Sequence, residues 1–164
     1  MQKLDVLNAK ILDNEELRKS VTFWRLMGKK IVFTNGCFDI IHRGHIDYLS
    51  KAADLGNILI IGLNTDASVK RLKGKGRPVN DEVARAQNLA ALFFIDAIIL
   101  FDEDTPYNLI KKVKPDILVK GSDYKSEDIV GHDIVKENGG EVVTIDLLPG
   151  YSTTSIIQKI KDLD

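Results

Sequence analysis

The sequence predicts a doubly wound α/β fold built on a five-stranded parallel sheet, and three observations indicate this class. Five short runs are built around consecutive Ile, Val, Leu and Phe residues more than around alternating ones, as expected for strands covered on both faces. Amphipathic stretches of helical length separate these runs and give a repeated β-α-β alternation. The 164 residues are 44% hydrophobic and 29% charged, which suits one folded domain and excludes a disordered or fibrous chain.

The predicted strands are joined by segments that carry helix signals. In chain order the strands are residues 30–35, 57–63, 97–101, 116–120 and 141–146. The first connecting helix, residues 45–55, has an apolar stripe and stops at Gly56. Three later helices are predicted from their caps: 83–92 after Asn80, 107–113 after Thr105 and Pro106, and 155–163 after Ser152.

The first 29 residues are predicted to form a helical extension in front of a domain that spans residues 30–164. Asp13 or Asn14 can cap a helix that ends at Gly28. The apolar positions of this helix are Leu17, Val21, Trp24 and Leu26. We expect the helix to pack against the edge of the domain; binding of a partner protein is the alternative.

Composition excludes several classes of function. Lys and Arg number 23 against 24 Asp and Glu, so the net charge of −1 gives no general affinity for nucleic acid or anionic membranes. Cys37 is the only cysteine, which excludes an internal disulfide and fits a reducing compartment. Neither a signal-peptide core nor a run approaching the ~20 apolar residues of a membrane span occurs in the sequence. These features predict a cytoplasmic protein with no nucleic-acid or membrane partner.

The candidate site follows the first predicted strand, because ligands of such sheets bind beyond the carboxyl ends of the strands. There the chain runs from Asn35 through a glycine turn to His42-Arg43-Gly44-His45 at the start of a helix. His42 and His45 are three residues apart, so they share one face near the positive end of that helix. Gly44 would let a ligand approach the backbone closely. The arrangement suits stabilisation of charge on a transferring phosphoryl or nucleotidyl group.

Two other interpretations of the histidine pair stay open. The pair could bind zinc with His132 or an acidic residue, although metalloprotease helices place their histidines four apart with a glutamate between them. The two side chains could also simply complete a helix cap.

Two signatures then resemble those of a known superfamily. His42-Arg43-Gly44-His45, preceded by Gly36-Cys37-Phe38-Asp39, resembles the His-x-Gly-His signature of the nucleotidyltransferases, and Tyr151-Ser152-Thr153-Thr154 resembles their second signature. Together with residues 62–74 and 119–124, these segments are similar to the adenylyltransferase domain of bacterial bifunctional ADP-heptose synthases, over about residues 10–161. The sugar-kinase domain of those proteins has no counterpart in the sequence, so we expect a stand-alone enzyme.

The resemblance implies a Rossmann-like nucleotidyltransferase fold and transfer of AMP from ATP, with Mg²⁺, to D-glycero-D-manno-heptose 1-phosphate, for lipopolysaccharide or another surface glycan. A single in-line displacement would release pyrophosphate. The catalytic residues it implies are His42, His45, Lys73 and Thr153. The implied nucleotide-binding residues are Asn35, Gly36, Cys37, Phe38, Gly44, Arg77, Lys120, Gly121, Asp123, Tyr151, Ser152 and Thr154. The implied substrate-binding residues are Asp39, Asn64 and Asp66.

The residues themselves leave alternatives open for most of these segments. For residues 152–154, the hydroxyls either form an anion site or serve only as a helix cap. For the basic stretch 70–77, the alternatives are a loop that closes over phosphates and a loop that is simply solvated. Asp39 and Asp66 hold Mg²⁺ or cap turns. Residues 120–124 form a simple turn or let Asp123 hold a sugar hydroxyl. Cys37 fits a small buried residue better than a nucleophile.

The base and the acceptor are set by the resemblance alone. Residues 147–150, Leu-Leu-Pro-Gly, stand where related cytidylyltransferases carry Arg-Thr-x-Gly, and the missing arginine favours ATP over CTP. A cytidylyltransferase acting on glycerol 3-phosphate is the alternative enzyme. A nucleotide-binding module without turnover is the alternative from another class. The resemblance also implies a homodimer and a separate sugar kinase upstream.

Overall fold

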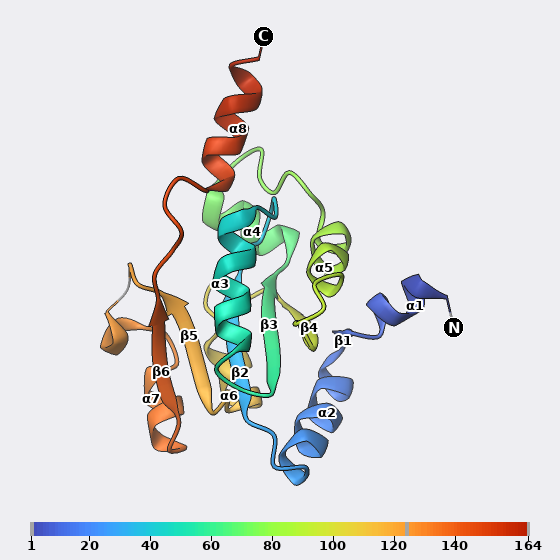
Figure 1. Ribbon diagram of the computed structural model, residues 1–164, viewed down its shortest axis with the longest axis vertical. Helices are drawn as coiled ribbons and strands as arrows, with labels where there is room; N and C mark the ends of the chain where they lie inside the picture. The colour runs from blue at the N-terminus through green and yellow to red at the C-terminus, as the bar shows by residue number, and fades with distance from the viewer. Residues whose placement is uncertain (1, 124, 164) are drawn as a thin grey trace.

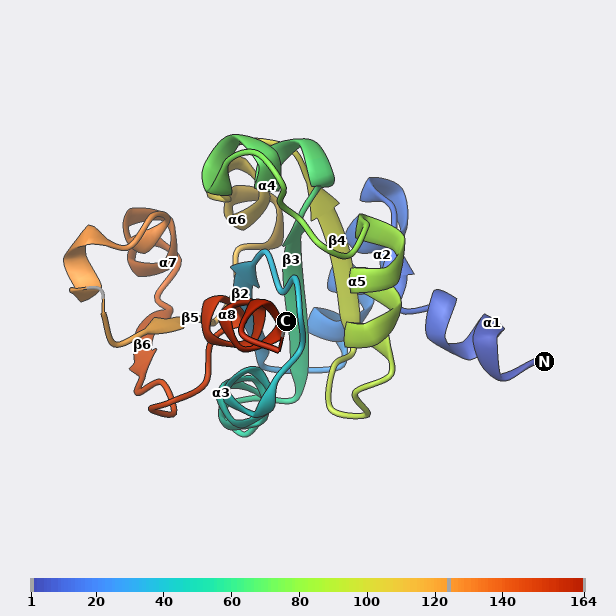
Figure 2. The same ribbon diagram turned by 90° about the horizontal axis from the view of Figure 1, so that it is seen from above.

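The computed structural model describes residues 2–123 and 125–163 and contains a six-stranded parallel sheet with helices on both faces (Figures 1 and 2). The strands lie in the order β1-β4-β3-β2-β5-β6. Their bounds are β1 Ile11–Leu12, β2 Ile31–Gly36, β3 Ile58–Asn64, β4 Ala97–Phe101, β5 Ile117–Gly121 and β6 Glu141–Ile145. The chain winds outward in opposite directions from β2, so the predicted doubly wound α/β class is confirmed.

The sheet has one strand more than the sequence predicts. Strand β1 lies in the segment predicted to be helical, and its two residues, Ile11 and Leu12, pair in parallel with Ile98 and Ile99 of β4. Two residues are too few to give the alternation or the apolar run by which strands are detected. The first 29 residues therefore contribute an edge strand to the sheet as well as helices.

The bounds of the helices are α1 Lys3–Asn8, α2 Asn14–Leu26, α3 Arg43–Ala53, α4 Asp66–Lys73, α5 Glu82–Ala90, α6 Tyr107–Val113, α7 His132–Glu137 and α8 Thr153–Lys161, with a 3₁₀ turn, η1, at Ser126–Asp128. Each predicted helix is found within about two residues of its predicted bounds, and α1, α4 and α7 are additional helices. The end of helix α4, residues 70–73, overlaps the stretch predicted to be a basic loop. Thr65 caps the start of this helix by accepting from the Ser68 N–H. None of the helices described is long and apolar enough to cross a membrane.

Two helix caps differ from those the sequence predicts. Asp81 rather than Asn80 caps α5, and its carboxylate accepts from the Ala84 N–H at 2.8 Å. Thr105 does not cap α6, which begins after Pro106 without a side-chain cap. Asp13 does cap α2, as predicted, and accepts from two backbone N–H groups. The α5 cap is displaced by one residue because Asn80 and Asp81 are adjacent and have nearly equal capping preferences.

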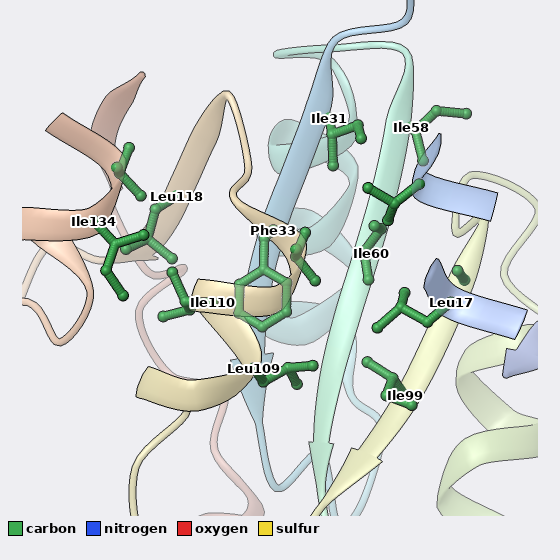
Figure 3. Close-up of a cluster of buried hydrophobic side chains, with 14 of the residues drawn as sticks. Leu17, Ile31, Phe33, Ile58, Ile60, Ile99, Leu109, Ile110, Leu118 and Ile134 are labelled. Atoms are coloured by element: carbon green, nitrogen blue, oxygen red, sulfur yellow. The ribbon is translucent and has the colours of Figure 1, made fainter. Parts of the chain in front are cut away.

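The apolar core lies in two layers, one on each face of the sheet. Figure 3 shows one layer, in which Leu17 of α2 and Leu109 and Ile110 of α6 surround Phe33 and Ile60 of the sheet. The helical residues that cover the opposite face are Tyr48, Leu49 and Ala52 of α3 and Ala86, Leu89 and Ala90 of α5. Helix α8 differs from these helices, since it contains no buried residue and extends away from the sheet with the C-terminus (Figure 1).

Candidate active site

A cavity of about 680 Å³ lies at the carboxyl ends of the central strands. It spans β2 and β5, where the strand order reverses and where ligands of doubly wound sheets bind. All of the predicted site residues except Asn64 and Asp66 line it. Those that do are Asn35, Gly36, Cys37, Phe38, Asp39, His42, Gly44, His45, Lys73, Arg77, Lys120, Gly121, Asp123, Tyr151, Ser152, Thr153 and Thr154.

The two histidines share one face at the start of α3, as their spacing predicts. Their rings are stacked, with centroids 3.8 Å apart and planes 18° apart. His42 is the N-cap of α3, and its Nδ1 accepts from the His45 backbone N–H at 3.3 Å. This contact leaves Nε2 of a neutral His42 as the nitrogen that carries the proton. Among the described residues, His45 Nδ1 is buried without a hydrogen-bond partner.

Both imidazoles are neutral near pH 7. Burial lowers the pKa of His42, and burial together with the neighbouring His42 lowers the pKa of His45 to about 4. Rings stacked at 3.8 Å cannot both carry a positive charge without repulsion. The pair therefore offers neutral N–H donors beside the positive end of a helix, a combination that binds phosphate oxygens.

The turn before the histidines has a strained residue and a crowded glycine. Phe38 has a φ of 44°, in the left-handed region that non-glycine residues rarely adopt. A Cβ at Gly44 would lie 3.1 Å from both the His42 ring and Tyr151 Cβ. Gly44 is therefore packed tightly against His42 and Tyr151. It also lines the cavity, and its role in admitting a ligand to the backbone stays a prediction. Burial raises the pKa of the Cys37 thiol, which fits the expectation that Cys37 is not a nucleophile.

The basic stretch is divided into an open tip and an anchored end. Lys73 ends α4 and is followed by Gly74 and Gly76, both with φ near 88° and no atom within 4 Å of a Cβ built on them. Arg77 is held, because its Nε donates to Asp39 Oδ2 at 2.7 Å. Of the basic stretch 70–77, only the tip between Lys73 and Arg77 is thus open, and its closure over phosphates stays a prediction.

The residues predicted to bind substrate make other contacts. Asp39 is buried and accepts hydrogen bonds from Arg77 and two backbone N–H groups, so it has no carboxylate oxygen free for Mg²⁺. Asn64 is buried outside the cavity and donates to Ser68 Oγ at 3.0 Å. Asp66 lies outside the cavity and accepts from Arg85 Nη2 at 2.7 Å. The residues described contain no cluster of three His, Cys, Asp or Glu side chains that could hold a metal.

Lys120 supplies a partly buried cation on the floor of the cavity. It is the penultimate residue of β5, and its Nζ donates to Asn35 Oδ1 of β2. Burial lowers the pKa of Lys120 to about 8, and the nearby Asp123 carboxylate opposes this shift. A Cβ on Gly121 would approach Asp123 Oδ1 to 2.6 Å, so a larger residue there would displace the Asp123 carboxylate. Tyr124, the last residue of the predicted turn, lies outside the described residues.

The remaining wall comes from the segment before α8. Ser152 caps this helix by accepting from the Ser155 N–H at 3.0 Å, and Thr153 Oγ1 donates to the Ile40 carbonyl at 3.5 Å. Arg43 lies over the Tyr151 ring and donates to its hydroxyl at 3.1 Å. The apolar side chains on this side of the cavity are Ile129, Val130, Leu147 and Leu148. Ser152 therefore has the cap role, and the cap does not use the Thr154 hydroxyl.

Sequence reasoning missed Arg85. Its side chain is fully buried in α5 and donates to the Cys37 carbonyl at 2.7 Å and to the Asn80 carbonyl at 3.1 Å. A signal was present, because Arg85 falls one turn before Leu89, on the apolar stripe of the predicted helix. A basic residue at such a position is costly to bury unless it is paired.

Comparison with known proteins adds family information. A cytidylyltransferase-like family model matches residues 33–159. The chain is 60% identical over 134 residues to the bifunctional protein HldE of Campylobacter concisus, covering 82% of the chain and 28% of that protein. It is 54% identical over 155 residues to the bifunctional protein HldE of Syntrophotalea carbinolica, and this match covers 94% of the chain and 32% of that protein. The chain thus spans about a third of the length of these curated relatives.

Solved structures agree with the fold. The crystal structure of the lipopolysaccharide core biosynthesis protein from Thermoplasma volcanium matches with a TM-score of 0.64 and 31% identity, over 74% of this chain and 99% of that one. Pantoate-beta-alanine ligase from Francisella tularensis matches with a TM-score of 0.58 and 15% identity, over 92% of this chain and 76% of that one. At this identity the match shows a shared fold only. The family predicted from the two sequence signatures is confirmed.

Proposed function

The chain belongs to the cytidylyltransferase-like family of nucleotidyltransferases, and we propose that it transfers AMP from ATP to D-glycero-D-manno-heptose 1-phosphate. The observation that carries the proposal is the stacked, neutral pair of His42 and His45 at the start of α3, inside the cavity at the point where strand order reverses. The names of the relatives support the choice of acceptor, since they are HldE proteins and a lipopolysaccharide core biosynthesis protein.

The proposed reaction is one in-line displacement. An oxygen of the acceptor phosphate attacks the α-phosphorus of ATP and forms the new P–O bond. The bond between the α-phosphorus and its bridging oxygen breaks, and pyrophosphate leaves with the electron pair. ATP would enter as its magnesium complex. Asp39, the candidate metal ligand, already accepts from Arg77 and from the Val79 and Asn80 N–H groups.

In this scheme the protein positions the reactants and stabilises charge. The N–H groups of His42 and His45 donate to the α-phosphate and its developing charge. Lys73 and Arg77 neutralise phosphates from the α4–α5 side, and the Thr153 and Thr154 hydroxyls donate to the pyrophosphate end. No group needs to remove a proton, because the attacking phosphate oxygen is already ionised near pH 7.

Adenine fits the apolar side of the cavity. Val130, Leu147 and Leu148 line the cavity and offer apolar surfaces to a purine ring. Residues 147–150, Leu-Leu-Pro-Gly, stand where related cytidylyltransferases carry an arginine. The cytidylyltransferase-like family match supports the second candidate, CTP with glycerol 3-phosphate.

A pyrophosphate-release assay tests the proposal. ATP, CTP and GTP are each combined with heptose 1-phosphate, glycerol 3-phosphate or no acceptor. We expect release only with ATP and heptose 1-phosphate. Release with CTP and glycerol 3-phosphate would select the second candidate, and tight ATP binding without any release would indicate a non-catalytic module.

We also propose that the protein is a homodimer and that a separate sugar kinase supplies the acceptor. Light scattering checks the first point, for which a mass of about twice 18.3 kDa is expected. A mass of 18.3 kDa would contradict it.

A further inference from the structure

A network of buried polar contacts joins the turn after β2 to the segment between α4 and α5. The Asp39 carboxylate, whose residue is 2% exposed, accepts from Arg77 Nε at 2.7 Å and from the backbone N–H groups of Val79 and Asn80 at 2.8 and 2.9 Å. The Asn80 side-chain amide donates to the Asp39 carbonyl at 2.8 Å. All the oxygens of Asp39 are therefore engaged within the protein.

Arg85 of α5 stabilises this network through hydrogen bonds of its own. Its guanidinium donates to the carbonyls of Cys37 and Asn80 and to the Asp66 carboxylate, at 2.7, 3.1 and 2.7 Å. The side chain has no solvent exposure, so its charge depends on these partners. Arg85 thus holds both chain segments that meet at Asp39. The set Asp39, Arg77, Asn80 and Arg85 is called the clamp below.

We propose that Asp39 and Arg85 are positioning residues, which hold Arg77 and the Phe38 turn in the arrangement that receives the triphosphate of ATP. The identity of the ligand rests on the proposed function. The inference assigns Asp39 to the protein scaffold, whereas the sequence suggests contact with substrate or Mg²⁺.

The geometry of Arg77 gives the clamp its function. Among the described residues, the hydrogen bonds of Arg77 use Nε, which leaves both Nη groups for a ligand in the cavity that Arg77 lines. A guanidinium fixed through one nitrogen loses less freedom when its other nitrogens bind phosphate. Among the described residues, no hydrogen bond or ion pair anchors the Lys73 side chain, and Gly74 and Gly76 separate it from Arg77.

The clamp also accounts for the turn. Phe38 keeps its positive φ of 44° between Cys37, whose carbonyl accepts from Arg85, and Asp39, whose carbonyl accepts from Asn80. Strained residues of this kind persist only where the surroundings fix them from several sides. Burial raises the pKa of Asp39, but the hydrogen bonds from Asn80, Val79 and Arg77 lower it by more, so the carboxylate stays ionised at neutral pH.

A double-mutant cycle on ATP affinity tests the proposal. Asp39→Asn keeps the shape of the side chain and removes the charge paired with Arg77, and Arg77→Ala removes the presented group. We expect each variant to weaken ATP binding by about tenfold, the loss typical of one charge-assisted hydrogen bond. The double variant is also expected to lose about tenfold, because Asp39 acts through Arg77.

The matched control is Asp116→Asn. The Asp116 carboxylate accepts from the Ile31 N–H at 2.7 Å at the opposite ends of the strands, outside the cavity. The Asp116→Asn substitution should change ATP affinity by less than about twofold, as expected for a substitution remote from the site. A loss of about a hundredfold in the double variant, the product of two independent tenfold effects, would show that Asp39 acts independently and would overturn the proposal. Equal losses in Asp39→Asn and Asp116→Asn would overturn it as well.

Amide hydrogen exchange gives a readout that needs no ligand. In Asp39→Asn, exchange at Val79 and Asn80 should accelerate while exchange in β3 stays unchanged; unchanged protection at Val79 and Asn80 would contradict the clamp. Should Asp39→Asn fail to fold, Asn80→Ala removes one arm of the clamp and enters the same cycle with Arg77→Ala. A wild-type protein that binds ATP but releases no pyrophosphate would contradict the proposed transfer and leave this test valid.

Discussion

The two walls of the cavity are built differently. The fixed wall consists of residues 36–45 and 77–81; it is closed by buried charges, and Asp39 is 2% exposed while Arg85 behind it is fully buried. The open wall consists of residues 147–154 at the start of α8. There Leu147 is 52% and Tyr151 43% exposed, and α8 contains no buried residue.

This difference separates groups that are positioned before ligand arrives from groups that are ordered with it. The fixed wall carries the histidines and Arg77, whose donors need little reorganisation to stabilise charge. The open wall is joined to it chiefly through the Arg43 contact with Tyr151 and the bond from Thr153 to Ile40. A segment with so few buried contacts opens at low free-energy cost, which suits the entry and release of a nucleotide.

The largest effect, on kcat, is expected from substitution of His45 in the fixed wall. His45→Ala removes a neutral donor placed for developing charge, and such donors contribute about two to three orders of magnitude in kcat. The measurement is the rate of pyrophosphate release at saturating ATP and acceptor. His132→Ala is the control, because His132 lies outside the cavity and should keep its rate. Near-normal turnover of a folded His45→Ala variant would remove the histidines from the mechanism.

A smaller effect is expected at the cavity floor, between the walls. The pKa of Lys120 is lowered to about 8, so its positive charge is present below that pH and is lost as the pH rises through it. We expect kcat/KM for ATP to fall above about pH 8, since this parameter reports the groups of the free enzyme. Asp123 faces Lys120, and His45 and Tyr48 line the same cavity with pKa values of about 4 and about 12, outside this range.

Variants of Lys120 identify the group. In Lys120→Arg the guanidinium stays charged to high pH, so the decline of kcat/KM above about pH 8 should disappear. Lys120→Met should remove the decline too and lower kcat/KM by about tenfold at pH 7, since one charge-assisted contact is lost. An alkaline decline that persists in both variants would assign it to another residue.

The smallest effect is expected in the open wall. Ser152→Ala removes the α8 cap and should destabilise the helix by about 1 kcal/mol, which corresponds to about fivefold faster amide exchange at Ser155. Saturating ATP should reverse most of this change if the nucleotide orders the open wall. Thr22→Ala is the control, because its hydroxyl bonds within α2 and caps no helix. If saturating ATP leaves the amide exchange rate of Ser155 unchanged, the open wall does not respond to the ligand.

Much of the site was predictable because its residues are close in sequence. The end of the strand at Asn35, the turn and both histidines lie within residues 35–45. His42 and His45 are only three residues apart, so local helix geometry places both rings on one face. The Ser152 cap is local in the same way. The roles of Asp39 and Asp66 were not predictable, because their partners, Arg77 and Arg85, lie 38 and 19 residues away.

The sequence by itself determined the alternation of strands and helices, the histidine pair and the family, since each depends on short-range periodicity or on a contiguous signature. Tertiary structure alone decided that β1 joins the sheet, that Gly44 makes room for Tyr151, and that Asp39 binds the protein's own arginine. The physical reason is that a carboxylate has the same chemistry toward a metal, a sugar or a guanidinium. Only the packing of α5 against the turn after β2 determines which of them it meets.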